Sequence, residues 1–492
     1  MRMTAGNYTS RSKAPSPHNQ PSREFFKHSS AQRINTNAII VEALRTEYPQ
    51  LHLSIHPAYA NDLLGFAAAG HAGISPIDNE KDRLTWRPYV PPATRLDGGR
   101  GIIASEVKFG KFLLDWHGKE YILYVVEGSD GTLFYGNQVL QYVLSPSVEA
   151  TDQLLLEAGV WSNELHNEVW VFDGGYWQKS YELWEAVQKA SWDDVILDKS
   201  MKDAIIADVD TFFDSRDTYE KLKVPWKRGI IYYGPPGNGK TISIKAMMSA
   251  LYKRKDPIPT LYVKSLASWA GPEYSINEIF TLARRTAPCY LVFEDLDSLV
   301  TDEVRSYFLN AVDGIQKNDG ILMVGSTNHL DRLDPGIAKR PSRFDRKYNF
   351  ANPNQQEREL YMKYWQGKLD DNKDIEFPDK LCPAVAKITN GFSFAYLQEA
   401  MVGSLLALAR EKDGFAERLC LECMEAHEKA GSGSCDREGK RVFKGLYDWV
   451  WIVRRVDEED PDLDNNVLWR EIKKQVRILR EELGKVEGQN KA

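Results

Sequence analysis

The sequence predicts an α/β fold: a parallel sheet flanked by helices, preceded by a smaller α+β domain and followed by a helical subdomain. A short apolar strand at residues 229–233 leads through a glycine-rich loop into a helix, and a second apolar strand at 290–293 ends in acidic residues. Apolar residues at helical spacing over 356–410 predict the third part. We expect a disordered tail, an amino-terminal α+β domain, a large α/β subdomain, a helical lid and a carboxyl-terminal helical tail, at residues 1–36, 37–185, 186–353, 354–430 and 431–492.

The overall composition excludes several classes of protein. Hydrophobic residues make up 42% and charged residues 27% of the 492 residues, as in a soluble globular protein, and no run approaches the roughly 18 apolar residues of a membrane-spanning helix. The formal net charge of -7 disfavours a protein that binds by neutralising nucleic-acid phosphates. Five cysteines in so long a chain do not form a disulfide scaffold. We therefore expect no transmembrane segment, no nucleic-acid partner and a reducing compartment.

Residues 1–36 are rich in Ser, Pro, Asn and Arg and contain one acidic residue, Glu24. So little apolar content cannot offset the entropy lost on ordering, which predicts a disordered tail. An acid-poor composition with Arg and Ser is also typical of mitochondrial transit peptides, but Pro15, Pro17 and Pro21 disfavour the amphipathic helix of such a peptide. We expect a cytoplasmic protein, with the mitochondrion as the alternative.

The segment 37–185 contains short stretches in which apolar and polar residues alternate, for example 106–114 and 121–126, which the turn-forming residues 116–119 connect. This pattern predicts a β-rich α+β domain. Its aromatic residues include Trp161, Trp170, Tyr176, Trp177 and Trp184. Because such residues are more typical of core packing than of a ligand site, we assign this domain no chemistry.

The glycine-rich loop after the first predicted strand matches the phosphate-binding pattern GxxxxGK[ST] in full. Glycines let successive backbone N–H groups converge on a phosphate at the start of the following helix, where the helix dipole favours negative charge. A lysine then reaches the β- and γ-phosphates, and a threonine hydroxyl binds Mg²⁺. The loop therefore predicts a site for ATP and Mg²⁺. Its residues are Gly234, Pro235, Pro236, Gly237, Asn238, Gly239, Lys240 and Thr241.

Glu294 and Asp295 directly follow the apolar run 290–293. In a buried parallel strand, such acids lie at the carboxyl end, which is where ligands bind in open α/β sheets. Since a phosphate loop lies upstream, we expect Mg²⁺ and an attacking water at these acids.

Five motifs follow one another in the central part of the chain. They are Ser191-Trp-Asp-Asp-Val195, the phosphate loop, the strand ending in Glu294-Asp295, Ser326-Thr-Asn328, and Arg340-Pro-Ser-Arg-Phe-Asp-Arg346. In this order they resemble an AAA ATPase module, over about residues 192–409. The resemblance implies hydrolysis of ATP by a homo-oligomeric ring, usually a hexamer, that acts on a protein substrate.

The resemblance also implies roles for single residues. Asn328 matches the sensor that hydrogen-bonds the γ-phosphate or the water, and Arg343 and Arg346 match the arginine fingers that act on the nucleotide of the neighbouring subunit. For Arg340, a solvated basic loop remains an alternative. Trp269, within residues 264–271, matches the aromatic of the pore loop that grips a polypeptide; a packing role is the alternative.

Three features depart from the family pattern. The usual Asp-Glu pair is swapped to Glu294-Asp295, as in the subgroup that resembles the mitochondrial translocase of the Rieske iron-sulfur protein. We expect Asp295 to polarise the water and Glu294 to organise Mg²⁺. The next helix follows Leu299 within a few residues, so a second pore loop is short or absent. In the lid, Phe394 and Tyr396 replace the family's glycine and acid.

A zinc site is one interpretation of the late cysteines. Cys420, Cys423, His427 and Cys435 supply the donors for it, but the first three fall at helical spacing, which favours packing on an ordinary helix. Further on, the alternating charges of residues 473–483 predict a solvated helix.

The expected function is that of an ATP-hydrolysing ring that remodels or threads proteins. One alternative is a translocase of folded proteins at a membrane, which the swapped acids suggest. Another is a nucleotide-gated scaffold with negligible hydrolysis.

Overall fold

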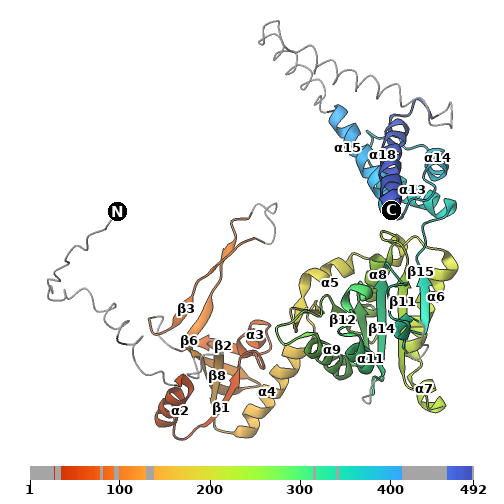
Figure 1. Cartoon of the computed structure of the whole chain (residues 1–492). Coiled ribbons are helices and arrows are strands. Elements are labelled where there is room, and N and C mark those ends of the chain that lie inside the picture. Colours follow the sequence, from red (N-terminus) through yellow and green to blue (C-terminus); the bar gives the residue numbers. More distant parts are fainter. Residues whose placement is uncertain are drawn as a thin grey trace, which may run out of the picture. The chain divides into compact units, whose positions relative to one another are not determined.

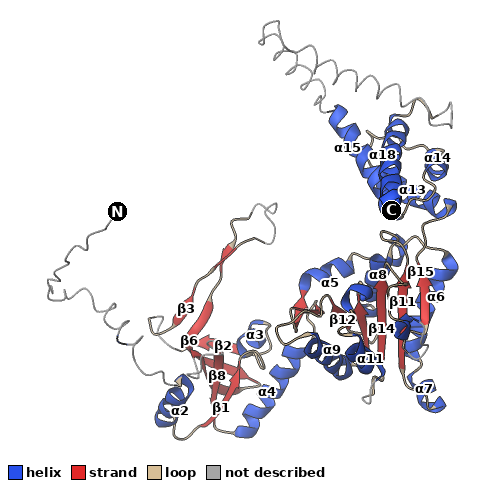
Figure 2. Cartoon of the chain, viewed as in Figure 1, coloured by secondary structure: helices blue, strands red, loops and turns tan. Residues whose placement is uncertain are grey.

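The computed structural model describes Lys27 and residues 35–77, 81–92, 99–128, 138–313, 317–338, 343–412 and 463–489. The chain divides into two compact units, which meet in the sequence between residues 164 and 165. Figure 1 labels their helices and strands, and Figure 2 separates them by type.

Unit 1 is built on an antiparallel sheet in the order β1-β8-β7-β6-β2, with β3 also paired to β6. Its strands are β1 His52–Pro57, β2 Gly73–Pro76, β3 Leu84–Trp86, β6 Glu106–Trp116, β7 Lys119–Gly128 and β8 Gln138–Ser145. Alternate residues of β7 enter two cores: Leu123 and Val125 pack with α3 Leu63–Ala68 and α4 Val148–Asn163, whereas Tyr124 and Val126 pack with α2 Thr36–Glu47. Unit 1 therefore combines an antiparallel sheet with helices packed on both of its faces.

Unit 2 contains a larger sheet in the order β10-β9-β12-β13-β14-β11-β15, parallel except for β10. Its strands are β9 Val169–Asp173, β10 Tyr176–Ser180, β11 Lys227–Tyr233, β12 Thr260–Val263, β13 Cys289–Phe293, β14 Ile321–Thr327 and β15 Arg346–Asn349. Every residue of β13 and β14 is buried, which explains the continuous apolar run of β13.

Helices cover both faces of this sheet. Leu291 and Phe293 point to the face covered by α9 Pro272–Thr286 and α11 Arg305–Asp313, while Tyr290 and Val292 point to the opposite face. That second face is covered by α5 Tyr181–Gln188, α6 Lys199–Asp214 and α8 Lys240–Tyr252. Shorter elements are η3 Trp192–Asp194, α7 Arg216–Leu222, α10 Leu296–Leu299 and α12 Pro335–Ala338. The predicted α/β class is confirmed for this part.

The expected domain boundary at residue 185 is wrong. The strands β9 and β10 belong to the large sheet, because β9 pairs in parallel with β12 and β10 completes the edge. Trp177 also packs against the core of the large sheet and donates through its Nε1 to the Glu278 carbonyl at 3.4 Å. Local patterning contains no information about the sheet that a strand joins, so the sequence alone does not reveal this assignment.

The lid consists of α13 Gln355–Lys368, α14 Leu381–Ile388, α15 Phe394–Lys412 and α18 Val467–Gln489. Trp469, Ile472, Val476 and Leu479 of α18 are buried in the same core as Leu397 of α15. The prediction of a solvated helix over 473–483 and of a separate tail from residue 431 is therefore wrong for α18. Apart from the buried Glu471, its described charged residues are exposed or half-buried, as on the outer face of an amphipathic helix.

Two sequence expectations concern the whole chain. Among the described residues, no helix is both long enough and apolar enough to cross a membrane. The proposed zinc donors, Cys420, Cys423, His427 and Cys435, lie outside the described residues.

Candidate active site

The predicted phosphate loop connects the end of β11 to the start of α8. Gly234, Gly237 and Gly239 have φ values of 139°, 77° and 90°, which residues with a Cβ rarely adopt. A Cβ at Gly234 would lie 2.4 Å from the Phe350 carbonyl oxygen, and one at Gly237 would lie 2.4 Å from the Ala395 Cβ. The loop therefore requires glycine both for its backbone conformation and for its close neighbours.

Lys240, the first residue of α8, lies against this loop. Its Nζ donates to the carbonyl oxygens of Gly234 at 2.7 Å and Pro235 at 2.9 Å. Burial lowers the pKa of the Lys240 ammonium below its usual value, and the carboxylates of Asp295 and Asp297 offset only part of this effect. An anionic ligand at this position would favour the charged form.

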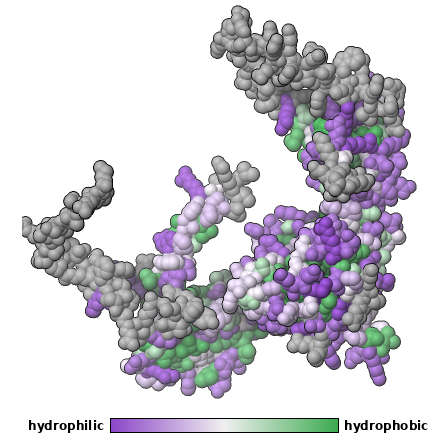
Figure 3. Space-filling view, viewed as in Figure 1, coloured by the Kyte–Doolittle hydropathy of each residue, from purple (hydrophilic) through white to green (hydrophobic). Residues whose placement is uncertain are grey.

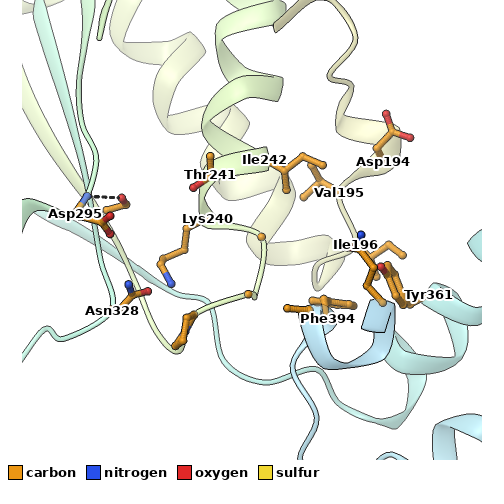
Figure 4. A pocket seen from close by; sticks show the side chains of 16 residues that line it. Asp194, Val195, Ile196, Lys240, Thr241, Ile242, Asp295, Asn328, Tyr361 and Phe394 are labelled. Carbon is orange, nitrogen blue, oxygen red and sulfur yellow. Dashed lines mark hydrogen bonds between the residues drawn. The ribbon is translucent and has the colours of Figure 1, made fainter. Parts of the chain in front are cut away.

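A cavity of about 480 Å³ opens in front of the loop. Figure 4 shows Lys240, Thr241, Asp295 and Asn328 gathered toward one end of it. They come from the start of α8 and from the carboxyl ends of β13 and β14, so the sheet topology brings them together. The other loop residues on its wall are Pro236, Gly237 and Gly239, whereas Gly234, Pro235 and Asn238 do not line it.

The two neighbouring acids differ in position. Asp295 lines the cavity, is exposed, and has a left-handed backbone with φ 50°; its N–H donates to the Ser326 Oγ at 3.2 Å. Glu294 does not line the cavity. Its Oε2 accepts a hydrogen bond from the Tyr262 hydroxyl, and its Oε1 is buried with no hydrogen-bond partner in the described part of the chain.

Tyr262, on β12, was not found from the sequence. Burial and then the bond to Glu294 raise the pKa of Tyr262 above its usual value, so the phenol stays protonated and is the donor. No sequence motif indicates this pair, because it depends on β12 lying beside β13 in the sheet.

Thr327, the residue before Asn328, is held in place by two hydrogen bonds. The Thr327 Oγ1 donates to the Asp297 Oδ1 at 2.7 Å and accepts from the His329 N–H at 2.9 Å. These bonds fix the end of β14 and thereby position Asn328 on the cavity wall.

The opposite end of the cavity is aromatic and apolar. Phe394 and Tyr361 of the lid lie there with their ring centroids 5.2 Å apart in an edge-to-face arrangement. Val195 and Ile196, which follow η3, and Gln398 also line the cavity, and Figure 4 shows Ile196 beside Tyr361. The sequence marks Phe394 only as a replacement for glycine, and it contains no signal for Tyr361.

Asn238 links the loop to the lid. Its Nδ2 donates to the Phe350 carbonyl at 3.2 Å and to the Asn352 Oδ1 at 2.9 Å, while its Oδ1 accepts the Phe394 N–H at 3.4 Å. The Ala395 N–H also donates to the Gly237 carbonyl at 3.1 Å. These hydrogen bonds connect the phosphate loop directly to the first turn of α15.

The two described arginines of the late motif lie outside the cavity. The Arg343 side chain is 8% exposed; its Nε pairs with the Asp313 Oδ2 at 2.6 Å and its Nη1 donates to the Gly336 carbonyl at 2.7 Å. The Arg346 side chain is 53% exposed and its Nε lies 3.2 Å from the Asp208 Oδ2. Arg343 is therefore bonded within its own subunit, whereas Arg346 lies at the surface. Arg340 lies outside the described residues.

Trp269 is 94% exposed in the loop before α9. The Ser268 Oγ donates to the Gly271 carbonyl at 2.9 Å and accepts a hydrogen bond from the Ala270 N–H at 3.2 Å. These bonds stabilise the turn that contains Trp269. The packing alternative is wrong for this subunit. The connection between α10 and α11 is only residues 300–304, as short as the sequence indicated.

Residues 230–352 match the family model described as "ATPase family associated with various cellular activities (AAA)". The chain carries an AAA ATPase domain. The match extends from β11 to just beyond β15, and it contains the phosphate loop, both acids, Asn328 and both described arginines. AAA domains are ATPases that generally bind ATP with Mg²⁺ and commonly assemble into oligomeric rings.

The residues of this AAA domain fit ATP with Mg²⁺. The loop presents backbone N–H groups and a lysine to an anion, and its glycines exclude any Cβ from the approach. Thr241 and Asp295 supply oxygen donors at the same end of the cavity, and the neighbouring Glu294 has a buried Oε1 with no hydrogen-bond partner in the described part of the chain. Oxygen donors of this kind suit Mg²⁺.

Proposed function

We propose that the chain hydrolyses ATP and uses the energy to remodel or thread a protein substrate. The observation that supports this proposal best is the single cavity that brings together Lys240, Thr241, Asp295 and Asn328 from separate elements of the AAA domain. A lysine, a hydroxyl, a carboxylate and an amide are the groups that phosphoryl transfer to water requires.

Each residue of this cavity has a separate role in the proposal. Lys240 exchanges its two loop carbonyls for the β- and γ-phosphate oxygens of ATP. Asp295 accepts a proton from the water whose oxygen attacks the γ-phosphorus, as ADP leaves, and Asn328 orients that water. Thr241 and Glu294 would hold Mg²⁺, which would neutralise negative charge at the phosphates.

The aromatic end of the cavity is proposed to hold the adenine. Phe394 and Tyr361 provide flat apolar surface of the kind on which bases stack. Because Phe394 belongs to the first turn of α15, nucleotide binding would fix the lid against the phosphate loop.

The proposed assembly is a ring, most simply a hexamer, in which an arginine of one subunit reaches the γ-phosphate bound by its neighbour. Arg346 suits this role better than Arg343, because its guanidinium is at the surface and has one carboxylate partner rather than a buried set. Trp269, exposed on its hydrogen-bonded turn, is proposed to grip the protein substrate in the pore. We place the ring in the cytoplasm.

The decisive test compares Asp295→Asn with Glu294→Gln. We expect Asp295→Asn to bind fluorescent ATP with unchanged affinity but to hydrolyse ATP at least about a hundredfold more slowly, the usual scale for losing a positioned general base. Glu294→Gln keeps the shape of a side chain that faces Tyr262 and should retain the larger share of turnover.

Two results would change the proposal. If Glu294→Gln binds ATP and stalls while Asp295→Asn turns over, the two acids have the opposite roles. If the unmodified chain binds ATP with Mg²⁺ and shows no turnover, the protein is a nucleotide-gated scaffold.

A further inference from the structure

Unit 1 carries an apolar ribbon whose large side chains are mostly exposed, although the Nζ of Lys108, on β6, lies 4.1 Å from the centroid of the Trp86 ring. We define it as β3 Leu84–Trp86 together with the paired strands β4 Tyr89–Val90 and β5 Ile102–Ile103. It extends from the sheet beside β6 as a narrow arm (Figure 1). Its large apolar side chains are exposed: Leu84 61%, Trp86 61%, Tyr89 58%, Val90 41%, Ile102 66% and Ile103 54%.

Both faces of the paired strands are apolar. Tyr89 lies opposite Ile103, and Val90 lies opposite Ile102. Since neighbouring residues of a strand point to opposite faces, one face carries the first pair and the other face carries the second. A two-stranded ribbon without a covering layer is marginally stable in water, so burial of both faces would stabilise it.

The ribbon nevertheless has a defined backbone. The Ala104 N–H donates to the Pro88 carbonyl at 2.9 Å, which extends the pairing by one step. Gly101 has φ 73°, and a Cβ there would lie 2.5 Å from the Val90 carbonyl oxygen and 2.6 Å from the Tyr89 ring. The close packing of Tyr89 over this glycine holds the two strands together.

Basic residues accompany the apolar ones. The described residues 81–92 and 99–107 contain four basic and two acidic side chains, a net charge of +2 within a chain of net charge -7, and Lys108, which follows, is paired with Glu106 and Glu127. Arg87 precedes β4, Arg100 precedes β5, and both side chains are exposed. Figure 3 shows hydrophobic and hydrophilic residues side by side on this part of unit 1.

We propose that the ribbon binds the surface of an anionic lipid bilayer. Trp, Tyr and Ile beside Arg are suited to the boundary between lipid headgroups and hydrocarbon, where apolar area and basic charge both contribute to binding. A fluid bilayer surrounds both faces of a narrow ribbon, whereas a rigid partner would have to present a slot that is apolar on two walls. A second copy of the ribbon is disfavoured because it carries the same positive charge.

Sedimentation of the purified full chain with vesicles tests this proposal. We expect binding to vesicles of phosphatidylcholine that contain about 30% phosphatidylserine, since their surface carries the negative potential that attracts basic residues. Binding to phosphatidylcholine alone should be at least about tenfold weaker, and binding to the anionic vesicles should fall as salt is added.

Two comparisons, each of a double variant in the ribbon with a control double variant outside it, test whether the ribbon is the binding site. Arg87→Glu with Arg100→Glu should weaken binding at least about tenfold, since each basic residue near an anionic surface contributes severalfold. Arg45→Glu with Lys119→Glu changes the charge of unit 1 equally at exposed positions outside the ribbon and should have a much smaller effect.

The second comparison tests how much the apolar side chains of the ribbon contribute to vesicle binding. Ile102→Ser with Ile103→Ser should also lose at least about tenfold in binding, whereas Leu156→Ser with Val160→Ser, equally exposed on α4, should not. Nucleotide affinity, measured for every variant, reports an intact AAA domain.

Three outcomes would overturn the proposal. The first is that the unmodified chain does not sediment with anionic vesicles at low salt. The second is that the control variants lose as much binding as the ribbon variants. The third is that the ribbon variants change the mass of the assembly in light scattering without changing vesicle binding, which would make the ribbon an interface between copies of the chain.

Discussion

Lys240 is a buried cation whose partners are already in place before any ligand binds. Its ammonium is bonded to two carbonyl oxygens of its own loop, and burial lowers its pKa. Binding of a triphosphate therefore replaces neutral acceptors by charged ones, and the gain comes from the stronger charge-assisted bonds.

We predict that Lys240→Ala weakens ATP binding at least about a hundredfold, because two charge-assisted hydrogen bonds are lost together. Titration with fluorescent ATP measures this loss. Lys245→Ala is the matched control, since Lys245 is a half-buried lysine of α8 that does not line the cavity. Equal affinity in the two variants would show that the loop is not the phosphate site.

At this scale the sequence indicated the identity of the important residues better than their orientation. Lys240, Thr241, Asn328 and Asp295 line the cavity, whereas Gly234, Pro235 and Asn238 of the loop do not. The orientation of Glu294 depends on Tyr262 of the neighbouring strand, and Arg343 is buried by Asp313, which is thirty residues away in the chain. Neither partner belongs to a motif.

Among the elements, helix α15 contacts both the phosphate loop and the core of the lid. Its first turn contacts the phosphate loop through Asn238 and Gly237, and its later residues pack with α18 in the lid core. Helix α15 therefore links occupancy of the cavity to the position of the whole lid.

Phe394 provides the test of this element. We predict that Phe394→Ala lowers the affinity for ATP about ten- to a hundredfold, the range for losing one base-stacking contact, and leaves the affinity for inorganic tripolyphosphate unchanged. Tyr396→Ala is the control, because Tyr396 packs on Phe392 and does not line the cavity. Competition with fluorescent ATP gives both affinities. A parallel loss for both ligands would mean that Phe394 supports the loop rather than the base.

The elements themselves were largely predictable, but their assignment to layers was not. Local spacing identified β11, α8 and β13 because each is a continuous signal in the chain. The 3-4-3 spacing of Trp469, Ile472, Val476 and Leu479 marks a buried stripe on α18, and the alternating charges between these residues obscured it. Strand order and the return of α18 to the lid are long-range pairings that local spacing does not encode.

For the whole molecule, the exposure of Arg346 and the burial of Arg343 suggest different consequences of removing each arginine. We predict that Arg346→Ala leaves the fold intact but nearly abolishes turnover. Arg343→Ala should instead destabilise the subunit, because Asp313 loses a partly buried ion-pair partner. Urea unfolding and ATP turnover separate the two effects.

A mixture of variants tests action between subunits. Lys240→Ala has an intact Arg346, and Arg346→Ala has an intact phosphate loop, so a random ring of equal parts contains working interfaces at about one quarter of its positions. We predict that turnover returns to about that fraction. If light scattering shows mixed rings and no activity returns, Arg346 acts within its own subunit or only holds the ring together.

The lid core also sets a condition on how the protein is synthesised. Its hydrophobic centre needs Trp469, Ile472 and Val476, which the ribosome adds long after the phosphate loop and the acids of the AAA domain have been made. Until then the emerging chain exposes the apolar faces of α13, α14 and α15. Nascent chains therefore keep apolar surface exposed for longer than the AAA domain alone would require, and a premature stop codon anywhere before α18 yields a protein that cannot complete its lid core.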